Sequence, residues 1–318
     1  MKLSEIFKTA IEMGIKNDPR GEDAVRAELQ KERRRYEKLS EKEKEFFDLD
    51  KLDNPYPDSR IVFGDTELKV KKVVAGIDIE TSELLLVDRL NEKGAKIDLL
   101  IAHHPIGKGK GSLGDVMSLQ CGYMSSVGVL PNVAEGIMAE RIKSVSRSVA
   151  VNNIFRTVDA ARLLNLPLIC IHTPADNMVN AYVTDFLAQK NLQTVGEVVE
   201  ALKEIPEYNL SAKNGVAPKI LSGMPDSSIG KIYVDFTGGT EGAEENFTRL
   251  SQAGISTVVV MHTSDKHLEV AKKNYMNVVL AGHISSDSIG LNLLLDKLAA
   301  NGVETVPFSG LMRVERNS

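Results

Sequence analysis

Short apolar runs alternate with amphipathic segments along the chain from residue 61 to its end. The apolar runs predict buried strands at 70–77, 97–102, 168–171, 217–222, 231–237, 256–261, 278–281 and 303–308. Apolar positions at helical spacing predict helices over 81–93, 135–165, 177–187, 195–202, 244–253, 267–275 and 286–301, with a polar connection at 206–217. Strands that alternate with helices in this way are typical of α/β layers with mainly parallel pairing.

The first 60 residues have a different pattern. Residues 3–15 carry apolar positions at helical spacing, whereas residues 22–47 are strongly charged and have only sparse apolar anchors. Ser40 and Glu43 fit a capping box that opens a second short helix. The turn-forming residues 54–58 close the segment, so we expect a helical amino-terminal extension held by few contacts.

Composition sets broad limits on function. The 318 residues are 42% apolar and 26% charged, with a formal net charge of −5, which is typical of a soluble globular protein of about two domains. Because no basic patch stands out, nucleic acid is not expected as a partner. Cys121 and Cys170 are too few for a disulfide framework, and Cys170 fits a core thiol. With no long apolar stretch and no signal peptide, we expect a cytoplasmic protein that does not bind membranes.

Three of the predicted strands end directly in residues of the type that bind metals. These are His103 and His104 after 97–102, His172 and Asp176 after 168–171, and His283 and Asp287 after 278–281. In open α/β sheets the ligand crevice lies beyond the carboxyl ends of the strands, so these side chains are expected to share one site. The adjacent pair His103 and His104 can give one ligand to each of two metals, or one ligand and one supporting group.

Simpler interpretations exist for the same residues. The two adjacent histidines could be structural, and Asp176 and Asp287 could be plain helix N-caps. His172 could bond a nearby backbone carbonyl rather than face a ligand. Residues 109–114 match a dinucleotide-binding glycine pattern formally, but no acidic residue completes it; Lys108 and Lys110 could instead meet an anion. The glycine-rich turn at 238–242 fits a tight connection better than a phosphate site.

These segments, in this order, resemble the NIF-three-like family, whose members are often named GTP cyclohydrolase type-two homologues. The resemblance runs from about residue 62 to the end and includes the 238–242 turn and the last strand. The initial helix at 3–15 is also family-like, whereas the charged stretch at 17–60 is not. After the helical segment at 1–60 we therefore expect a metal-binding α/β domain at 61–205 and 278–318, and a second, interleaved α/β domain at 206–277. The family forms ring-like hexamers, so the resemblance also implies a homo-oligomer. The metal ligands that it implies are His103, His104, Asp176, His283 and Asp287.

The chain departs from the family pattern in three places. Asp287 stands where the family usually has glutamate, which shortens the reach of the carboxylate by one methylene. The family's usual Thr-Gly-Glu appears here as Met261, His262 and Thr263, so that carboxylate is missing, while His267 still aligns with a family histidine. The segment between Ile106 and Ile154 is longer than usual, which is consistent with a modified pocket.

Three imidazoles and two carboxylates suit two divalent transition-metal ions, such as Zn, Fe, Mn or Ni. The leading hypothesis is a metal-dependent hydrolase that acts on a small nucleotide-like or phosphorylated molecule. A metal-activated water would be the nucleophile, with His172 or His267 relaying protons. The alternative is a non-catalytic regulatory or metal-handling protein.

Overall fold

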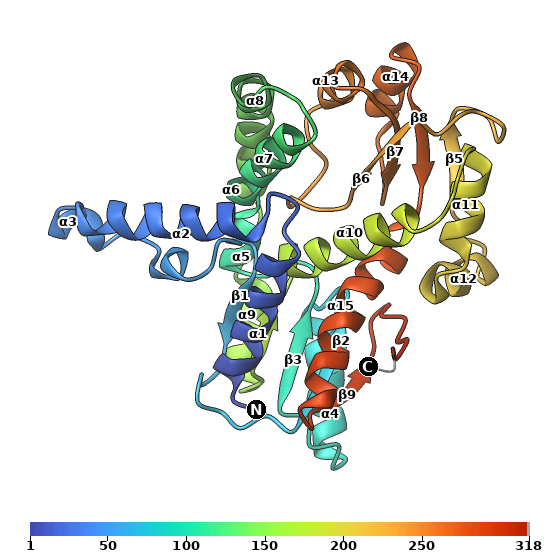
Figure 1. The fold of residues 1–318 in the computed structure, drawn as a ribbon. Helices are drawn as coiled ribbons and strands as arrows, with labels where there is room; N and C mark the ends of the chain where they lie inside the picture. The colour runs from blue at the N-terminus through green and yellow to red at the C-terminus, as the bar shows by residue number, and fades with distance from the viewer. Residues whose placement is uncertain (317–318) are drawn as a thin grey trace.

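The computed structural model describes residues 1–316, which form two β-sheets surrounded by helices (Figure 1). The first sheet has five strands in the order β1-β4-β3-β2-β9. Its strands are β1 (Arg60–Phe63), β2 (Lys72–Gly76), β3 (Leu99–Ala102), β4 (Leu168–Cys170) and β9 (Glu304–Pro307). All its pairs are parallel except β1 with β4. The expected α/β class is therefore confirmed.

The second sheet has four strands in the order β5-β8-β7-β6. They are β5 (Lys219–Ser222), β6 (Lys231–Asp235), β7 (Ile255–Val260) and β8 (Asn277–Leu280), and only β5 with β8 is antiparallel. The strand predicted at 278–281 thus lies in this sheet, whereas the domain division from the sequence put it with the metal-binding domain. Its hydrogen bonds to β7 and β5 set its place, and sequence order alone could not show them.

Helices cover both faces of each sheet and connect the two halves. They are α1 (Leu3–Lys16), α2 (Glu22–Glu37), α3 (Glu41–Lys44), α4 (Thr81–Glu92), α5 (Lys108–Gly111), α6 (Leu113–Val116), α7 (Ser118–Ser126), α8 (Pro131–Ala150), α9 (Arg156–Leu163), α10 (Thr173–Ala188), α11 (Val195–Lys203), α12 (Pro206–Lys213), α13 (Asn246–Gln252), α14 (Asp265–Lys273) and α15 (His283–Ala300), with a 3₁₀ turn at Leu49–Leu52. Figure 1 shows α10 and α15 running between the two sheets. No helix in residues 1–316 is long and apolar enough to cross a membrane.

The cores follow from the alternation of side chains along the strands. In β3, Leu99 and Ile101 face α1, α10 and α15, while Leu100 and Ala102 face α4 and α9. All four residues are fully buried, because helices cover both faces. In the second sheet, Val259 of β7 likewise packs toward α10, α11 and α12. This burial fixes the register of the strands. The register in turn sets where the polar residues that follow each strand lie at the edge of the sheet.

Two local predictions are corrected. The polar connection expected at 206–217 contains helix α12, which begins with Pro206 at its first position and buries Tyr208. The helix expected over 135–165 is two helices, α8 and α9, separated by residues 151–155. Strand β1 was not predicted from the sequence pattern; it is a short strand at the edge of the first sheet.

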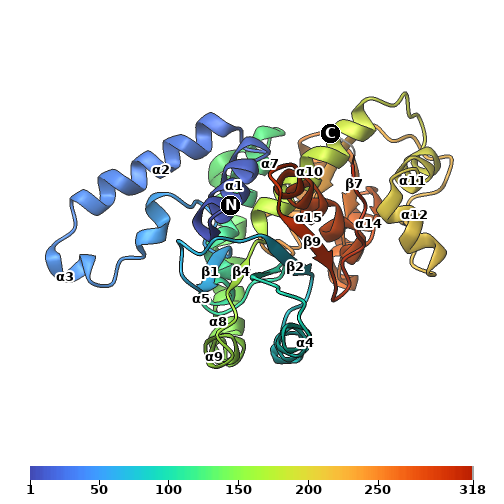
Figure 2. The ribbon, with the colours of Figure 1, turned by 90° about the horizontal axis from the view of Figure 1, so that it is seen from below.

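The charged amino-terminal extension projects from the body as α2 and α3 (Figures 1 and 2). The expected capping box is confirmed, because Ser40 and Glu43 each bond the backbone N–H of the other. Val25 and Leu29 are the buried residues of α2, so this helix is held at its first half. The extension ends in the turn at residues 54–59, from which Asp58 and Ser59 contact His172.

Candidate metal centre

The carboxyl end of β3 places the two adjacent histidines. Its strand pairing continues past Ala102, since the His103 N–H donates to the Gly76 carbonyl (2.9 Å) and the His104 N–H donates to the Ile77 carbonyl (3.0 Å). The backbone of both histidines is therefore fixed by the sheet. His103 is almost fully buried, whereas His104 is partly exposed.

The first turns of α10 and α15 bring the other candidate residues. His172 is the N-cap residue of α10, and Asp176 follows one turn later. His283 is the first residue of α15, and Asp287 follows one turn later. Neither aspartate is an N-cap residue, so that alternative is excluded for both.

Hydrogen bonds orient three of the imidazoles in the same way. The Nδ1 atom of His103 lies 3.1 Å from the Ile171 carbonyl. The Nδ1 atom of His104 lies 2.6 Å from the Asp78 carboxylate, and that of His172 lies 2.7 Å from the Asp58 carboxylate. Because each partner is an acceptor, each Nδ1 carries the proton, and the Nε2 atom is left with its lone pair toward the centre. This is the arrangement in which proteins hold metal-binding histidines.

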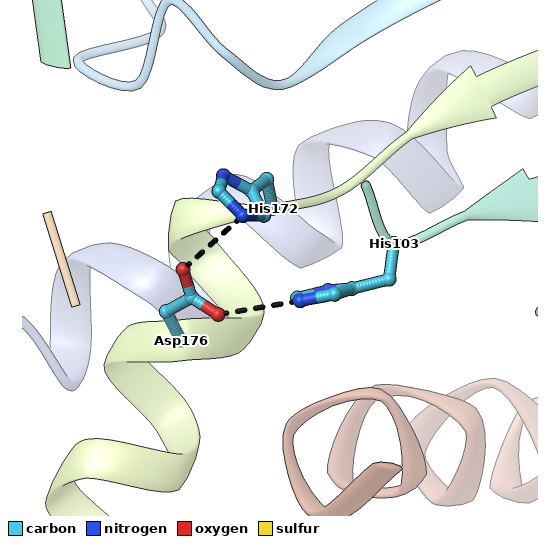
Figure 3. Close-up of side chains that lie close together, drawn as sticks. All are labelled: His103, His172 and Asp176. Carbon is cyan, nitrogen blue, oxygen red and sulfur yellow. Dashed lines mark ion pairs between the residues drawn. The ribbon is translucent and has the colours of Figure 1, made fainter. Parts of the chain in front are cut away.

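Asp176 lies between two of these imidazoles (Figure 3). One carboxylate oxygen is 3.4 Å from Nε2 of His103, and the other is 3.7 Å from Nε2 of His172. The ligand atoms of these three residues all lie within 4.8 Å of one another. They form a first group that could hold a metal ion.

Asp287 joins the remaining histidines. Its Oδ1 atom is 3.4 Å from Nε2 of His103, and its Oδ2 atom is 3.5 Å from Nε2 of both His104 and His283. His103, His104 and Asp287 form a second group that could hold a metal, with the same 4.8 Å limit between ligand atoms. The two groups share His103, so the three strand ends do meet at one place.

Buried polar atoms without partners test whether the residues fit a metal. Nε2 of His103 and both carboxylate oxygens of Asp287 are buried and have no hydrogen-bond partner among the described residues. An unsatisfied buried acceptor costs about 1–3 kcal/mol, and three of them converge here. A cation placed between them would satisfy all three, so the donor set fits a metal ion.

The ionisation of the cluster also depends on its burial and close charges. Burial raises the pKa of Asp176 well above its usual range. Burial acts in the same direction on Asp287, but the neighbouring His103 and His104 outweigh it and hold the pKa of Asp287 well below its usual range. Asp287 and Asp78 raise the pKa of His104 to about 9 against the effect of burial, whereas burial lowers the pKa of His283 to about 4. A metal at this cluster would therefore compete with a proton on His104.

Sequence reasoning missed the two carboxylates behind the histidines. Asp58 is fully buried, and besides His172 it accepts a hydrogen bond from the Thr173 hydroxyl (2.7 Å). Asp78 lies just past the end of β2. Asp78 could have been found from the sequence, because it closely follows a predicted strand. Asp58 could not, because it lies in the turn at residues 54–59, which follows no predicted strand.

A cavity opens from the cluster toward the second sheet. Its lining includes His172, Asp176, His283 and Asp287 on one side and His262 and His267 on the other. Both ring nitrogens of His267 have partners, the Ser264 hydroxyl (2.7 Å) and the Gly242 carbonyl (3.1 Å). His262 is exposed, and its ring stands 4.9 Å from that of His283. The relay role expected for His267 stays a prediction, and His262 is a candidate that the sequence did not single out.

Removing the carboxylate behind His172 should weaken metal binding without removing a ligand. In Asp58→Asn we expect metal affinity to fall about 10- to 100-fold, because a neutral amide replaces the negatively charged carboxylate that holds the imidazole and raises its basicity. Competition with a chromophoric chelator measures the affinity. The exposed Asp65→Asn is the matched control, and equal affinity of the two variants would show that Asp58 has no part in holding the metal.

Comparison with solved structures identifies the fold. A NIF3 superfamily protein from Sphaerobacter thermophilus matches with a TM-score of 0.70 and 27% sequence identity, over 80% of this chain and 92% of that chain. This chain is NIF3-like. Reduced HcgD from Methanocaldococcus jannaschii matches the NIF3-like chain with a TM-score of 0.50 and 14% identity, over 78% and 87% of the two chains, which supports the fold alone. No family model matches the sequence, and no curated protein matches it.

The fold and the resemblance expected from the motifs are thus confirmed. The NIF3-like chain holds His and Asp groups that could bind metal. They include His172, which was not among the expected ligands, and leave out His283, which was. The division into domains and the role of each ligand stay predictions.

Proposed function

We propose that the NIF3-like chain is a metal-dependent hydrolase that acts on a small molecule bound in the cavity between the cluster and the second sheet. One observation carries the proposal: the unpartnered Nε2 of His103 and carboxylate of Asp287 belong to a cluster that forms one wall of that cavity. A metal held there would have an open side toward a ligand, as hydrolytic sites require.

The residues of the two groups would hold two divalent ions. His172 and Asp176 belong to one group and His104 and Asp287 to the other, while the Nε2 atom of His103 belongs to both and has one lone pair to give to either ion. His283 reaches the second group through Asp287. When bound, such ions supply Lewis acidity toward a substrate oxygen and a source of nucleophile at neutral pH. Asp58 and Asp78 fix the imidazoles so that little reorganisation accompanies binding.

His262 supplies the proton transfer that hydrolysis requires. It lines the cavity, stands beside His283 and is exposed, so water can exchange protons with it. General acid–base catalysis by one positioned imidazole contributes about 10²- to 10⁴-fold to a rate. His267 is held by Ser264 and Gly242, and in this proposal it supports the cavity wall instead of relaying protons.

The metal-loaded protein should hydrolyse at least one member of a panel of nucleotides, phosphoesters and amides. His104→Ala should abolish that turnover, and His262→Gln should lower kcat by about 10²-fold or more while the metal content stays unchanged. Turnover is followed by product release, and metal content by elemental analysis. The nucleotide-like or phosphorylated substrate implied by the resemblance stays a prediction, as does the homo-oligomer.

The alternative is a non-catalytic metal-handling protein. The partial exposure of His104 and His283 favours it, with side chains 27% and 40% accessible, because an open edge permits metal exchange. Tight metal binding with no turnover of any panel member would establish this alternative over the hydrolase.

A further inference from the structure

The wall of the cavity that faces the metal centre is acidic. Asp235 ends β6, and Glu241 follows in the loop between β6 and α13. Both line the cavity, as do Asp176 and Asp287 on the opposite side. The cavity therefore carries four carboxylates, of which Asp235 and Glu241 lie outside the metal-binding groups.

In the described part of the chain, no lysine or arginine side chain balances this second pair of carboxylates, although Nδ1 of His267 lies 3.3 Å from Oε1 of Glu241. Within residues 1–316, no lysine or arginine lines the cavity. Burial raises the pKa of Asp235 to about 7, and the nearby Glu241 adds to the effect. Arg141 contacts Glu241 only through the backbone carbonyl (3.0 Å). Asp235 is half-buried beside Glu241 and forms no ion pair with any residue from 1 to 316. This is an unfavourable state for a carboxylate, which a bound donor or cation would relieve.

Another cavity-lining group also lacks a donor. The Oδ1 atom of Asn246 is buried and has no hydrogen-bond partner among the described residues. Glu241 is positioned by the Ser264 N–H, which donates to its Oε1 atom (2.8 Å), so its carboxylate does not swing freely. Asn246, Asp235 and Glu241 thus present acceptors from three places on one wall. Glu241 has the Ser264 N–H as a donor, whereas the buried Oδ1 of Asn246 has none among the described residues. An acceptor in that state implies a ligand that brings N–H groups.

The surface between these acceptors is apolar and partly aromatic. Phe236, Phe247, Leu250 and Met261 line the same cavity, and all four are buried. Flat aromatic and aliphatic side chains can contact the faces of a planar group while carboxylates bind its edge. The wall therefore suits a planar, donor-bearing group better than a flexible polyol or a phosphate chain.

We propose that the second-sheet wall of this cavity binds an amidine- or guanidine-type group of the substrate, with Asp235 and Glu241 accepting its N–H bonds. The inference rests on the proposed function, because it names the substrate class of that same site. The substrate then carries its hydrolysable group at the metal centre and its N–H-rich group on the far wall. A carboxylate that accepts from a planar N–H fork makes paired, charge-assisted bonds.

Three probes of nearly the same shape test the proposal on the full-length chain. Benzamidine is cationic, benzamide is neutral and benzoate is anionic. Binding is measured by calorimetry on chelator-treated protein, so that benzoate cannot bind through a metal. We expect benzamidine to bind, benzamide to bind at least tenfold more weakly, and benzoate not to bind. Equal or tighter binding of benzoate would overturn the proposal.

Variants locate the binding on this wall. Asp235→Asn and Glu241→Gln should each weaken benzamidine about 10- to 100-fold, since each removes a charged acceptor. Glu244→Gln changes an exposed glutamate in the same loop and should leave the affinity unchanged. Benzamidine binding that is insensitive to both cavity variants would overturn the proposal. Because these measurements need neither metal nor turnover, a missing hydrolase activity would leave their result intact and refute only the proposed reaction.

Discussion

His103→Ala will leave the chain unable to retain divalent metal at either group. His103 is the residue that the two candidate groups share, and its Nε2 atom lies 3.4 Å from both Asp176 and Asp287. Loss of this imidazole removes the nitrogen ligand that both groups depend on and leaves the carboxylates of Asp176 and Asp287 facing each other. We expect no metal above background after loading and dialysis, measured by elemental analysis.

The loss of metal binding in His103→Ala can also be measured through the free energy of unfolding. A ligand that binds only the folded state at 100 times its Kd stabilises a protein by about 2.7 kcal/mol. Zinc at that level should raise the free energy of unfolding of the unaltered chain by about this amount and leave that of His103→Ala unchanged. His103→Gln also removes the imidazole but leaves a smaller cavity than alanine does. If this variant folds and still binds no metal, the loss of metal is not caused by loss of folding.

His262→Ala is the control for both measurements. His262 lines the cavity but belongs to neither group, so its removal should change neither metal content nor the stabilisation by zinc. If His103→Ala retained two equivalents of metal like this control, the assignment of the cluster as a metal centre would be wrong.

Gly290→Ala will destabilise the protein and damage the centre from a distance. Gly290 is buried in α15 where that helix crosses α10. A Cβ atom there would lie 2.8 Å from the carbonyl carbon of Ala175, and closer still to its oxygen. Because the obstacle is backbone, the two helices must separate, at a cost of about 1–3 kcal/mol.

The separation also reaches the site. Ala175 precedes Asp176 on α10, and Asp287 lies one turn before Gly290 on α15. Moving the helices apart therefore moves these carboxylates apart, and we expect weaker metal binding together with the lower stability. Urea denaturation measures the first effect, and chelator competition measures the second.

Gly136→Ala is the matched control for this substitution. Gly136 is an exposed residue of α8, and a Cβ there meets nothing within 4 Å. Alanine should stabilise the protein by about 0.4–1 kcal/mol, because it restricts the unfolded chain without strain. A Gly290→Ala variant as stable as Gly136→Ala would show that the helix crossing tolerates a methyl group and would contradict the argument.

Much of the metal centre could be predicted from the sequence, because most of its residues directly follow a predicted strand or lie one helical turn apart. Apolar runs such as 97–102 predict buried strands, and the residue that follows such a run must emerge at the sheet edge. His103 and His104 were therefore located to within one residue. The spacing of four between His172 and Asp176 placed both on one turn, whatever the rest of the fold did.

The remaining parts of the site required contacts between distant segments. Asp58 reaches His172 across 114 positions, and nothing near Asp58 in the sequence indicates that partner. The opposite wall, with Asp235 and Glu241, faces the centre only because α10 and α15 join the two sheets (Figure 1). The place of β8 in the second sheet was likewise decided by pairing with β5 and β7.

The sequence by itself determined the order of most strands and helices and which ligand-type residues follow the strands. Those properties depend on side-chain periodicity and on turn chemistry, which act over a few residues. Only the tertiary structure decided which carboxylates support the histidines and what lines the cavity. These features depend on packing between segments far apart in the chain, where burial and the need to satisfy buried polar groups select the partners.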